Sequence, residues 1–559
     1  MFNSIKKITP NKFSKIIFLF FIISFISLSF NSLKDKDFEL SKNLDIYQTL
    51  LRELNIYYVD EIEPGELIKK SINVMLQSLD PYTAHISESM IEDFRTTFTG
   101  EYSGIGALIR GIGGKVIVAE PYENSPAIKA GLKAGDIFLE VDGISVKGKS
   151  STEVSELLKS QTKTIIKVLV ERPGEEENIK FEFERDIVRI DNVPYYGMLE
   201  NKTAYIRATG FTNNAGNEVR NAIKSLKNDY DVKGIILDLR ANPGGLLIEA
   251  VNMANIFIDE GVEIVSTRGK AKHWDKTYFT RQKSDDLEIP VAVLVNSQSA
   301  SASEIVAGSL QDLDRAVIIG QKSFGKGLVQ TTRKLAYNNQ LKLTTAKYYI
   351  PSGRCIQALD YSNRNEDGSV GKIADSLITK FKTKNGRVVQ DGGGILPDIV
   401  LEQRTLSKIS ASLLMKNIIF DFATQYAIDH KSIGPAKEFS INDNDYDQFV
   451  KFLEGKDYKY NSESETSVNT LIEIAKREEF YESIEDEIKS IKDKLLDNPE
   501  NEIYKFKDEI SEIITAEIVS RYYNRKGKIE SLLRNDHEVK KAVEILADRE
   551  EYEKILSGK

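Results

Sequence analysis

The feature that most constrains the fold is an alternation of apolar and amphipathic segments from Val188 to about Glu402. Short apolar runs such as VKGIILDLR, VAVLVN and AVIIG have the pattern of buried strands, and AGNEVRNAIKSLKND has the apolar spacing of a helix. Strands that alternate with helices are typical of an α/β core in which helices cover the sheet. We therefore predict an α/β core over residues 187–404.

Other patterns flank this core, and a chain of 559 residues exceeds what one hydrophobic core holds. Residues 37–99 show mainly helical spacing, whereas residues 100–186 show short strands separated by glycine turns, with one helix at SSTEVSELLKSQ. Residues 405–559 are rich in Lys and Glu, and their apolar stripes predict helices that pack on each other or on the core. The stripes consist of Ile484, Ile488, Ile491, Leu495, Val539, Val543 and Leu546.

Residues 1–32 have the pattern of an export signal. Four lysines precede the apolar run IIFLFFIISFISLSF, after which NSLKDKD is abruptly polar. An apolar run of this length is typical of a signal peptide and shorter than the roughly 20 residues that a spanning helix needs. We expect export to the periplasm or cell envelope. Cleavage of the signal and its retention as an inner-membrane anchor both stay open, because the small residues before Ser32 form no A-x-A site.

The composition excludes several classes of function. The formal net charge is −9, and no Lys/Arg block outside the N-terminus resembles a phosphate-binding surface, so nucleic acid is not the expected partner. The single cysteine, Cys355, excludes an internal disulfide framework. The four histidines lie far apart and lack the spacing of a zinc site.

The stretch VNSQSASASEIVAGSLQD, residues 295–312, places several serines where a strand pattern changes into a helix pattern. The first turn of a helix has unpaired N–H groups and partial positive charge, which suit a developing oxyanion. Ser301 and Glu304 also fit the S-x-x-E capping box, so a purely structural role of these serines stays open on this stretch alone.

A serine hydroxyl needs a base, and the next loop supplies a candidate in Lys326 of GQKSFGKGLVQ. Burial lowers the pKa of an ammonium and can make a lysine a general base, and the glycines beside Lys326 would let backbone approach it closely. Gln330 lies four residues further on and could orient the amine. His273, the only histidine of the core region, is the alternative base, although RGKAKHWDK resembles an exposed loop.

The same loop raises a second alternative, because GQKSFGK matches the phosphate-binding pattern G-x-x-x-x-G-K. The residue that follows is Gly327, which offers no hydroxyl to magnesium, and LVQTTRKL has the pattern of a strand. A third turn, Asn242-Pro243-Gly244-Gly245, follows the strand pattern VKGIILDLR, and its glycines could expose backbone N–H groups. An ordinary glycine turn is the other interpretation of that motif.

Together these segments resemble the carboxyl-terminal processing peptidases, also called tail-specific proteases, which use a Ser-Lys dyad and contain a PDZ domain. The resemblance covers roughly residues 37–402 and rests on blocks in the family's order: LDPYTAHIS, EYSGIGALI, SPAIKAGLKAGDIFLEVDGISV, YIRATGF, GIILDLRANPGGLL, VNSQSASASEIVAGSLQD, GQKSFGKGLVQ, AKYYIPSGRCIQ and GGILPDIVLE. It implies a multidomain α/β and α+β protein with a helical N-terminal region, an inserted PDZ β-module, a crotonase-like α/β protease core and a helical C-terminal extension.

The resemblance also implies residue roles. Ser301 is the expected nucleophile, Lys326 the general base and Gln330 its orienting partner, and the N–H groups of Gly245 and Ala302 are the expected oxyanion hole. Which glycine of the pair acts stays open. Ser299 and Ser303 are expected to pack or cap. Cys355 departs from the family pattern, in which Ser or Thr is expected.

Residues 100–186 resemble the PDZ domain of that family, on AGLKAGD followed by VDG. In it, Ser103, Gly104, Ile105 and Gly106 would offer backbone amides to a terminal carboxylate, while an edge strand adds the peptide by β-augmentation. Whether this domain gates the catalytic site stays open.

The expected function is that of an exported serine endopeptidase that recognises and cleaves protein substrates near their C-termini, without a cofactor. The alternative is a catalytically silent PDZ scaffold of the cell envelope. The expected partners are protein substrates bound through their tails. An envelope adaptor, a homo-oligomer and the role of residues 405–559 stay open.

Overall fold

The computed structural model describes residues 37–558, except 366–368, 374, 459, 461–462 and 496–498. The export signal expected in residues 1–32 lies outside these described residues. Within the described part, no helix combines the length and apolar character needed to cross a membrane. The chain divides into two compact units, Met1–His85 and Ile86–Lys559.

The first unit is helical over most of its described length. Residues 37–57 form one helix, and α2 (Pro64–Gln77) follows after a short loop, with proline in its first turn where no intrahelical N–H bond is lost. Residues 37–99 are mainly helical, as predicted, with an interruption at residues 80–87, where Asp80 holds a turn by accepting hydrogen bonds from the N–H groups of Tyr82 and Thr83. The short strand β1 (Ala84–Ile86) follows this turn. The second unit begins with η1 (Glu88–Met90) and α3 (Ile91–Thr99), which are again helical.

A β-module follows in the second unit. Its sheet has the order β3-β4-β5-β7-β8, with β6 beside β5, and its chain enters and leaves through β2 and β9, which pair antiparallel. Alternate residues of β7 are buried, as expected for a sheet with one face toward a core. The elements are β2 (Glu101–Gly104), β3 (Ala107–Ile112), β4 (Lys115–Pro121), α4 (Pro126–Ala130), β5 (Ile137–Val141), β6 (Ile144–Ser145), α5 (Ser151–Leu158), β7 (Ile165–Glu171), β8 (Ile179–Glu184) and β9 (Asp186–Arg189).

The α/β core is built on a six-stranded sheet of order β10-β11-β12-β15-β16-β23. Its strands run parallel except for β10, which pairs antiparallel with β11. The elements are β10 (Tyr195–Met198), η2 (Glu200–Lys202), β11 (Thr203–Arg207), α6 (Ala215–Asp229), β12 (Gly234–Asp238), α7 (Leu247–Ala254), β15 (Val291–Val295), α8 (Ala302–Asp312), β16 (Val317–Gly320) and β23 (Ile399–Val400).

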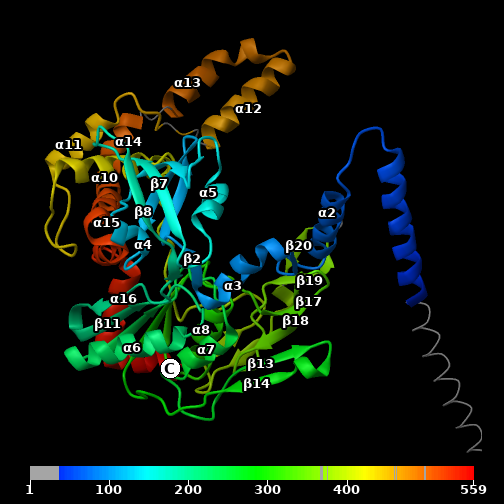
Figure 1. The fold of residues 1–559 in the computed structure, drawn as a ribbon. Helices are drawn as coiled ribbons and strands as arrows, with labels where there is room; N and C mark the ends of the chain where they lie inside the picture. Colours follow the sequence, from blue (N-terminus) through cyan, green and yellow to red (C-terminus); the bar gives the residue numbers. More distant parts are fainter. Residues whose placement is uncertain are drawn as a thin grey trace, which may run out of the picture. The chain divides into compact units, whose positions relative to one another are not determined.

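Both faces of this sheet are covered, which explains why its strands are apolar at consecutive positions. Ile235 and Val293 pack with residues of α6, α7 and α8, whereas Ile236 and Leu294 face the opposite way, toward the C-terminal helices α16 (His537–Ala547) and α17 (Arg549–Ser557). Figure 1 shows α6 and α7 on one side of the strands and the red α16 on the other. The C-terminal extension therefore completes the third layer of the core.

A second, antiparallel set of strands lies beside the core, in which β18 pairs with β13 and β17, and β13 pairs with β14. Two small hairpins pair β19 with β20 and β21 with β22. The elements are β13 (Glu263–Gly269), η3 (Lys272–Trp274), β14 (Lys276–Phe279), β17 (Leu328–Lys334), β18 (Gln340–Tyr349), β19 (Leu359–Arg364), β20 (Val370–Lys372), η4 (Asp375–Leu377), β21 (Lys380–Lys382) and β22 (Val388–Gln390).

The C-terminal extension is helical, as predicted. Its elements before α16 are α9 (Lys408–Met415), α10 (Ile418–Asp429), α11 (Asp443–Phe452), α12 (Glu463–Arg477), η5 (Tyr481–Ser483), α13 (Glu485–Leu495), α14 (Pro499–Lys505) and α15 (Lys507–Leu533). Val539, Val543 and Leu546 pack on the core sheet and Ile488 packs against α12, as the apolar stripes predicted. The expectation is wrong for Ile491, whose side chain remains 43% exposed.

Candidate active site

Ser301 lies in the turn between β15 and α8, at the carboxyl end of a central parallel strand. Its backbone has φ +56° and ψ −111°, a conformation that costs a non-glycine residue on the order of 1–3 kcal/mol. All residues of α8 are buried, while Ser301 itself is partly exposed. A buried helix thus holds this strained serine with its side chain near the surface.

The neighbouring serines have structural hydrogen bonds. The hydroxyl of Ser299 donates to the carbonyl oxygen of Leu239 at 2.9 Å, and that of Ser303 donates to the carbonyl oxygen of Asn242 at 2.9 Å. Both side chains are fully buried. Ser299 and Ser303 therefore join the Ser301 turn to the loop after β12.

Glu304 connects Ser301 with the loop that contains Lys326. Its Oε2 accepts hydrogen bonds from the N–H of Ser301 at 2.8 Å and from the N–H of Lys326 at 2.9 Å. Its Oε1 accepts from the Ser323 hydroxyl and the Gly325 N–H, both at 2.6 Å. One carboxylate oxygen of Glu304 therefore binds the main-chain N–H groups of both predicted catalytic residues.

The carboxyl group of Glu304 is fully buried. Burial raises its pKa above the ordinary value, although the hydrogen bonds from Ser323 and from the amides of Lys326, Gly325 and Ser301 oppose that rise. Four converging donors match the acceptor capacity of an ionised carboxylate.

Tyr348 provides a second connection between the same two segments. Its hydroxyl lies 3.2 Å from the carbonyl oxygen of Ser301 and also hydrogen-bonds to the carbonyl oxygen of Lys326. Tyr348 as a whole is 1% exposed. Tyr348 lies in the block AKYYIPSGRCIQ, from which no role for it was predicted, and the sequence pattern predicted only a capping role for Glu304.

Because Gly325 and Gly327 have no side chains, a neighbouring backbone segment approaches the Lys326 loop closely, as predicted from the sequence. A Cβ on Gly325, where φ is +87°, would lie 2.4 Å from the Cβ of Ala358, and one on Gly327 would lie 2.8 Å from the nitrogen of Gln357. Gln357 also accepts a hydrogen bond from the Gly327 N–H at 2.8 Å. The segment after Cys355 therefore packs directly against the Lys326 loop.

Gln330 lies in β17, next to a β-bulge between Val329 and Gln330. Its side-chain amide donates to Thr344 Oγ1 at 3.3 Å. The strand predicted from LVQTTRKL is present as β17. The loop after β16 therefore does not lead into the helix that a phosphate-binding loop requires. His273 lies in the exposed turn η3, with its ring 4.5 Å from that of Trp274.

The two glycines after β12 have different surroundings. A Cβ on Gly244 would lie 2.8 Å from the Ala302 nitrogen and 2.9 Å from the Ser301 Cβ, whereas one on Gly245 would lie 2.4 Å from the Phe211 carbonyl oxygen. The chain at Gly244 therefore passes directly against the nucleophile turn. Ala302 is the first residue of α8, and its N–H precedes the intrahelical bonds. The oxyanion roles of Gly245 and Ala302 stay a prediction.

The close approach at Gly244 gives a testable prediction. Gly244→Ala places a methyl group at hydrogen-bond distance from the Ala302 nitrogen, where an oxyanion would bind, so we expect loss of at least about 10²-fold in kcat, as for the loss of an oxyanion donor. Gly261→Ala is the matched control, because Gly261 also has positive φ, +83°, but has open space around it. Equal activity of the two variants would contradict the prediction.

The β-module has a groove of about 400 Å³ between its edge strand β3 and helix α5. Of the four residues predicted to bind a peptide terminus, Ile105 lines this groove. Gly106 has φ +77°, and Ser103 and Gly104 lie in β2, paired with Ile187 and Asp186 of β9. Ser103 Oγ is buried without a hydrogen-bond partner among the described residues. An open strand edge facing a helix suits β-augmentation by a peptide.

Comparisons with known proteins match three parts of the chain to family models. Residues 202–362 match peptidase family S41, residues 117–172 match a PDZ domain, and residues 409–546 match the C-terminal helical domain of probable PDZ-proteases.

Similar proteins come from several bacteria. A carboxy-terminal-processing protease of Bartonella bacilliformis is 38% identical over 322 residues, which cover 57% of this chain and 73% of that protein. A probable CtpA-like serine protease of Staphylococcus haemolyticus is 31% identical over 475 residues, covering 84% of this chain and 86% of the relative. Among solved structures, a photosystem II D1 C-terminal processing protease is 27% identical, with a TM-score of 0.34, covering 64% of this chain and 92% of that one.

Proposed function

This chain belongs to peptidase family S41, the carboxy-terminal-processing serine proteases, and we propose that it is an exported endopeptidase that cleaves proteins near their C-termini with a Ser301–Lys326 dyad. It is a multidomain serine peptidase with a PDZ domain and a helical C-terminal domain. The dyad, the export and the preference for C-termini are the parts that we propose.

One observation supports the dyad above all. A single carboxylate oxygen of Glu304 accepts hydrogen bonds from the main-chain N–H groups of both Ser301 and Lys326. Because their backbones share one acceptor atom, we propose that the side chains of Ser301 and Lys326 meet over a bound peptide. Both residues are partly exposed, so that a substrate can reach them.

In the proposed reaction, Ser301 Oγ attacks the peptide carbonyl carbon while the Lys326 amine accepts the hydroxyl proton. The N–H groups of Ala302 and Gly245 bind the oxyanion of the tetrahedral intermediate. The intermediate collapses when the ammonium of Lys326 returns the proton to the leaving amine, and water then hydrolyses the acyl-enzyme by the same path in reverse. Gln330 orients the lysine.

The PDZ domain would select the substrate. We propose that the C-terminal tail of a protein adds to strand β3 in the groove beside α5 and so brings the preceding chain to Ser301. The open strand edge and the helix that faces it support this role. The basic and apolar pattern of residues 1–32 supports export to the cell envelope.

Obstructing the groove tests tail recognition. Ser155 lines the groove from α5, and Ser155→Trp is expected to raise KM about tenfold or more for a substrate with an apolar C-terminal tail, which is about 1.4 kcal/mol of lost binding. The control, Ser160→Trp, changes an exposed residue outside the groove. Steady-state kinetics on tailed and tail-free substrates would refute the role if Ser155→Trp left KM for the tailed substrate unchanged.

The cellular activity is tested by mass spectrometry of envelope proteins from cells that express the parent or its Ser301→Ala variant. Trimmed C-termini are expected only with the parent. If both cultures give the same C-termini, the alternative of a silent PDZ scaffold is favoured.

A further inference from the structure

Three adjacent parallel strands of the core lead into the three predicted catalytic segments. Strand β12 precedes the Gly244–Gly245 loop, β15 precedes Ser301 and β16 precedes the Lys326 loop. The order in the sheet is β12-β15-β16, so β15 lies between the other two. Just beyond the outer strands lie Arg240 and Gln321.

Both of these residues are bound by one side chain of the C-terminal helix α16. Glu538 Oε2 accepts a hydrogen bond from Arg240 Nη1, and Glu538 Oε1 accepts one from Gln321 Nε2. The Glu538 side chain is 7% exposed. One buried carboxylate therefore spans the end of β15 and joins the two strand ends that flank the nucleophile strand.

Asp536 strengthens the same connection. Its carboxylate lies 2.8 Å from Arg240 Nη2, and its Oδ1 accepts from the N–H groups of Glu538 and Val539, both at 3.0 Å, as the N-cap of α16. Arg240 also pairs with the fully buried Asp238 at 2.6 Å. Burial alone would lower the pKa of Arg240, but the facing carboxylates of Asp238 and Asp536 outweigh it and raise that pKa, so the guanidinium stays charged.

The contacts continue from these anchors to the catalytic turn. Arg240 is followed by Ala241, at φ +56°, and by Asn242, whose carbonyl oxygen accepts from the Ala300 N–H at 3.0 Å and from Ser303 Oγ at 2.9 Å. Gln321 lies two residues before Ser323, which donates to Glu304. A shift of Arg240 or Gln321 would therefore move the segments that contain Ser301 and Lys326.

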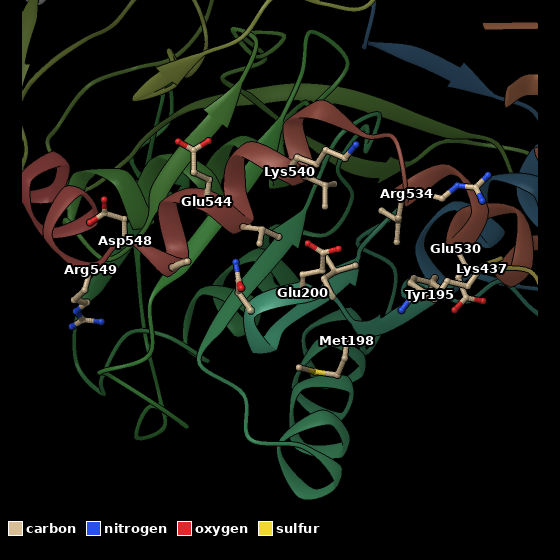
Figure 2. A pocket seen from close by; sticks show the side chains of 16 residues that line it. Tyr195, Met198, Glu200, Lys437, Glu530, Arg534, Lys540, Glu544, Asp548 and Arg549 are labelled. Carbon is tan, nitrogen blue, oxygen red and sulfur yellow. The ribbon is translucent and has the colours of Figure 1, made fainter. Parts of the chain in front are cut away.

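Helix α16, which carries these two carboxylates, is anchored on the core sheet. It packs on the core sheet through buried Val539, Ala542 and Leu546. Figure 2 shows Lys540 and Glu544 on α16, which line a groove of about 920 Å³ together with Tyr195 and Met198 of β10. Glu544 is exposed and pairs only with Lys541 among the described residues, so it offers a control on the same helix.

We infer that Asp536 and Glu538 are positioning residues of the active site, so that the C-terminal helical domain sets the geometry between the nucleophile turn and the lysine loop. This inference rests on the proposed function. The last helices would then affect turnover by way of Arg240 and Gln321, in addition to covering the sheet.

The test compares Asp536→Asn, Glu538→Gln and the control Glu544→Gln in the full chain. Asparagine caps a helix as well as aspartate does, so Asp536→Asn removes the charge that faces Arg240 and leaves α16 capped. We expect kcat on a tailed peptide to fall about tenfold or more in Asp536→Asn and Glu538→Gln, with KM and Tm of Asp536→Asn near the parent values. The acid limb of the kcat–pH profile, which reports the general base in the bound complex, is expected to shift as well.

Each outcome decides between the two proposals. Parental kcat and an unchanged acid limb in a folded Asp536→Asn would overturn the positioning role, while the Lys326 dependence of the parent would leave the proposed function standing. A parent that cleaves nothing, or that cleaves equally well without Lys326, would overturn both. If Glu538→Gln fails to fold, Asp536→Asn alone decides.

Discussion

Lys326→Ala is expected to lower kcat by about 10²- to 10⁴-fold, the usual contribution of a general base, with little change in KM. The physical reason is that the Ser301 hydroxyl is a weak nucleophile until its proton is removed, and the main chain of Lys326 is fixed beside that of Ser301 by Glu304 and Tyr348. Steady-state hydrolysis of a peptide with an apolar tail measures the effect. Added small primary amines are expected to restore part of the activity, because the alanine leaves space for them.

Two control variants test whether the loss of activity is specific to the Lys326 amine. Lys322→Ala removes an exposed lysine from the same loop and is expected to leave kcat unchanged, which separates the base from the general charge of the loop. His273→Ala is also expected to be neutral, because His273 lies in the exposed turn η3. If Lys326→Ala turned over like the parent while His273→Ala did not, the histidine-dependent alternative would replace the dyad.

Glu304→Gln is expected to abolish most activity and to destabilise the core. A carboxylate accepts hydrogen bonds at both oxygens, and four donors converge on it here. A glutamine must turn its NH₂ group toward two of these donors in either orientation. Each donor left unsatisfied in the interior costs about 1–3 kcal/mol, and the pairs at stake are Ser301 with Lys326 or Ser323 with Gly325.

Thermal unfolding and kcat measured on the same preparation check this prediction. Glu260→Gln makes the same chemical change at an exposed site and is expected to alter neither quantity. A Glu304→Gln variant with parental stability and parental turnover would show that the carboxylate does not hold the two loops together.

The elements of the core could be predicted from local patterns in the sequence. Strand and helix periods predicted α6 at residues 215–229, β12, β15 and β17, because side chains that face a core repeat at the period of the element. Small residues at strand ends indicated the turns that contain Ser301, Lys326 and the glycine pair, because close backbone approach needs the absence of bulky side chains, and the family resemblance implied the role of each residue. The helical spacing of residues 37–99 did not show the turn at residues 80–87, where the Asp80 carboxylate accepts hydrogen bonds from the N–H groups of Tyr82 and Thr83.

The sequence by itself determined the order of the domains and the layered core, since each of these leaves a local pattern, and its family resemblance implied the candidate nucleophile and base. Only the tertiary structure decided what holds that site together. The carboxylate of Glu304 meets the Lys326 loop 22 residues away, and Glu538 meets Arg240 298 residues away. Such contacts depend on where the fold brings two distant segments, and an ion pair between single side chains has no period that a linear sequence could display.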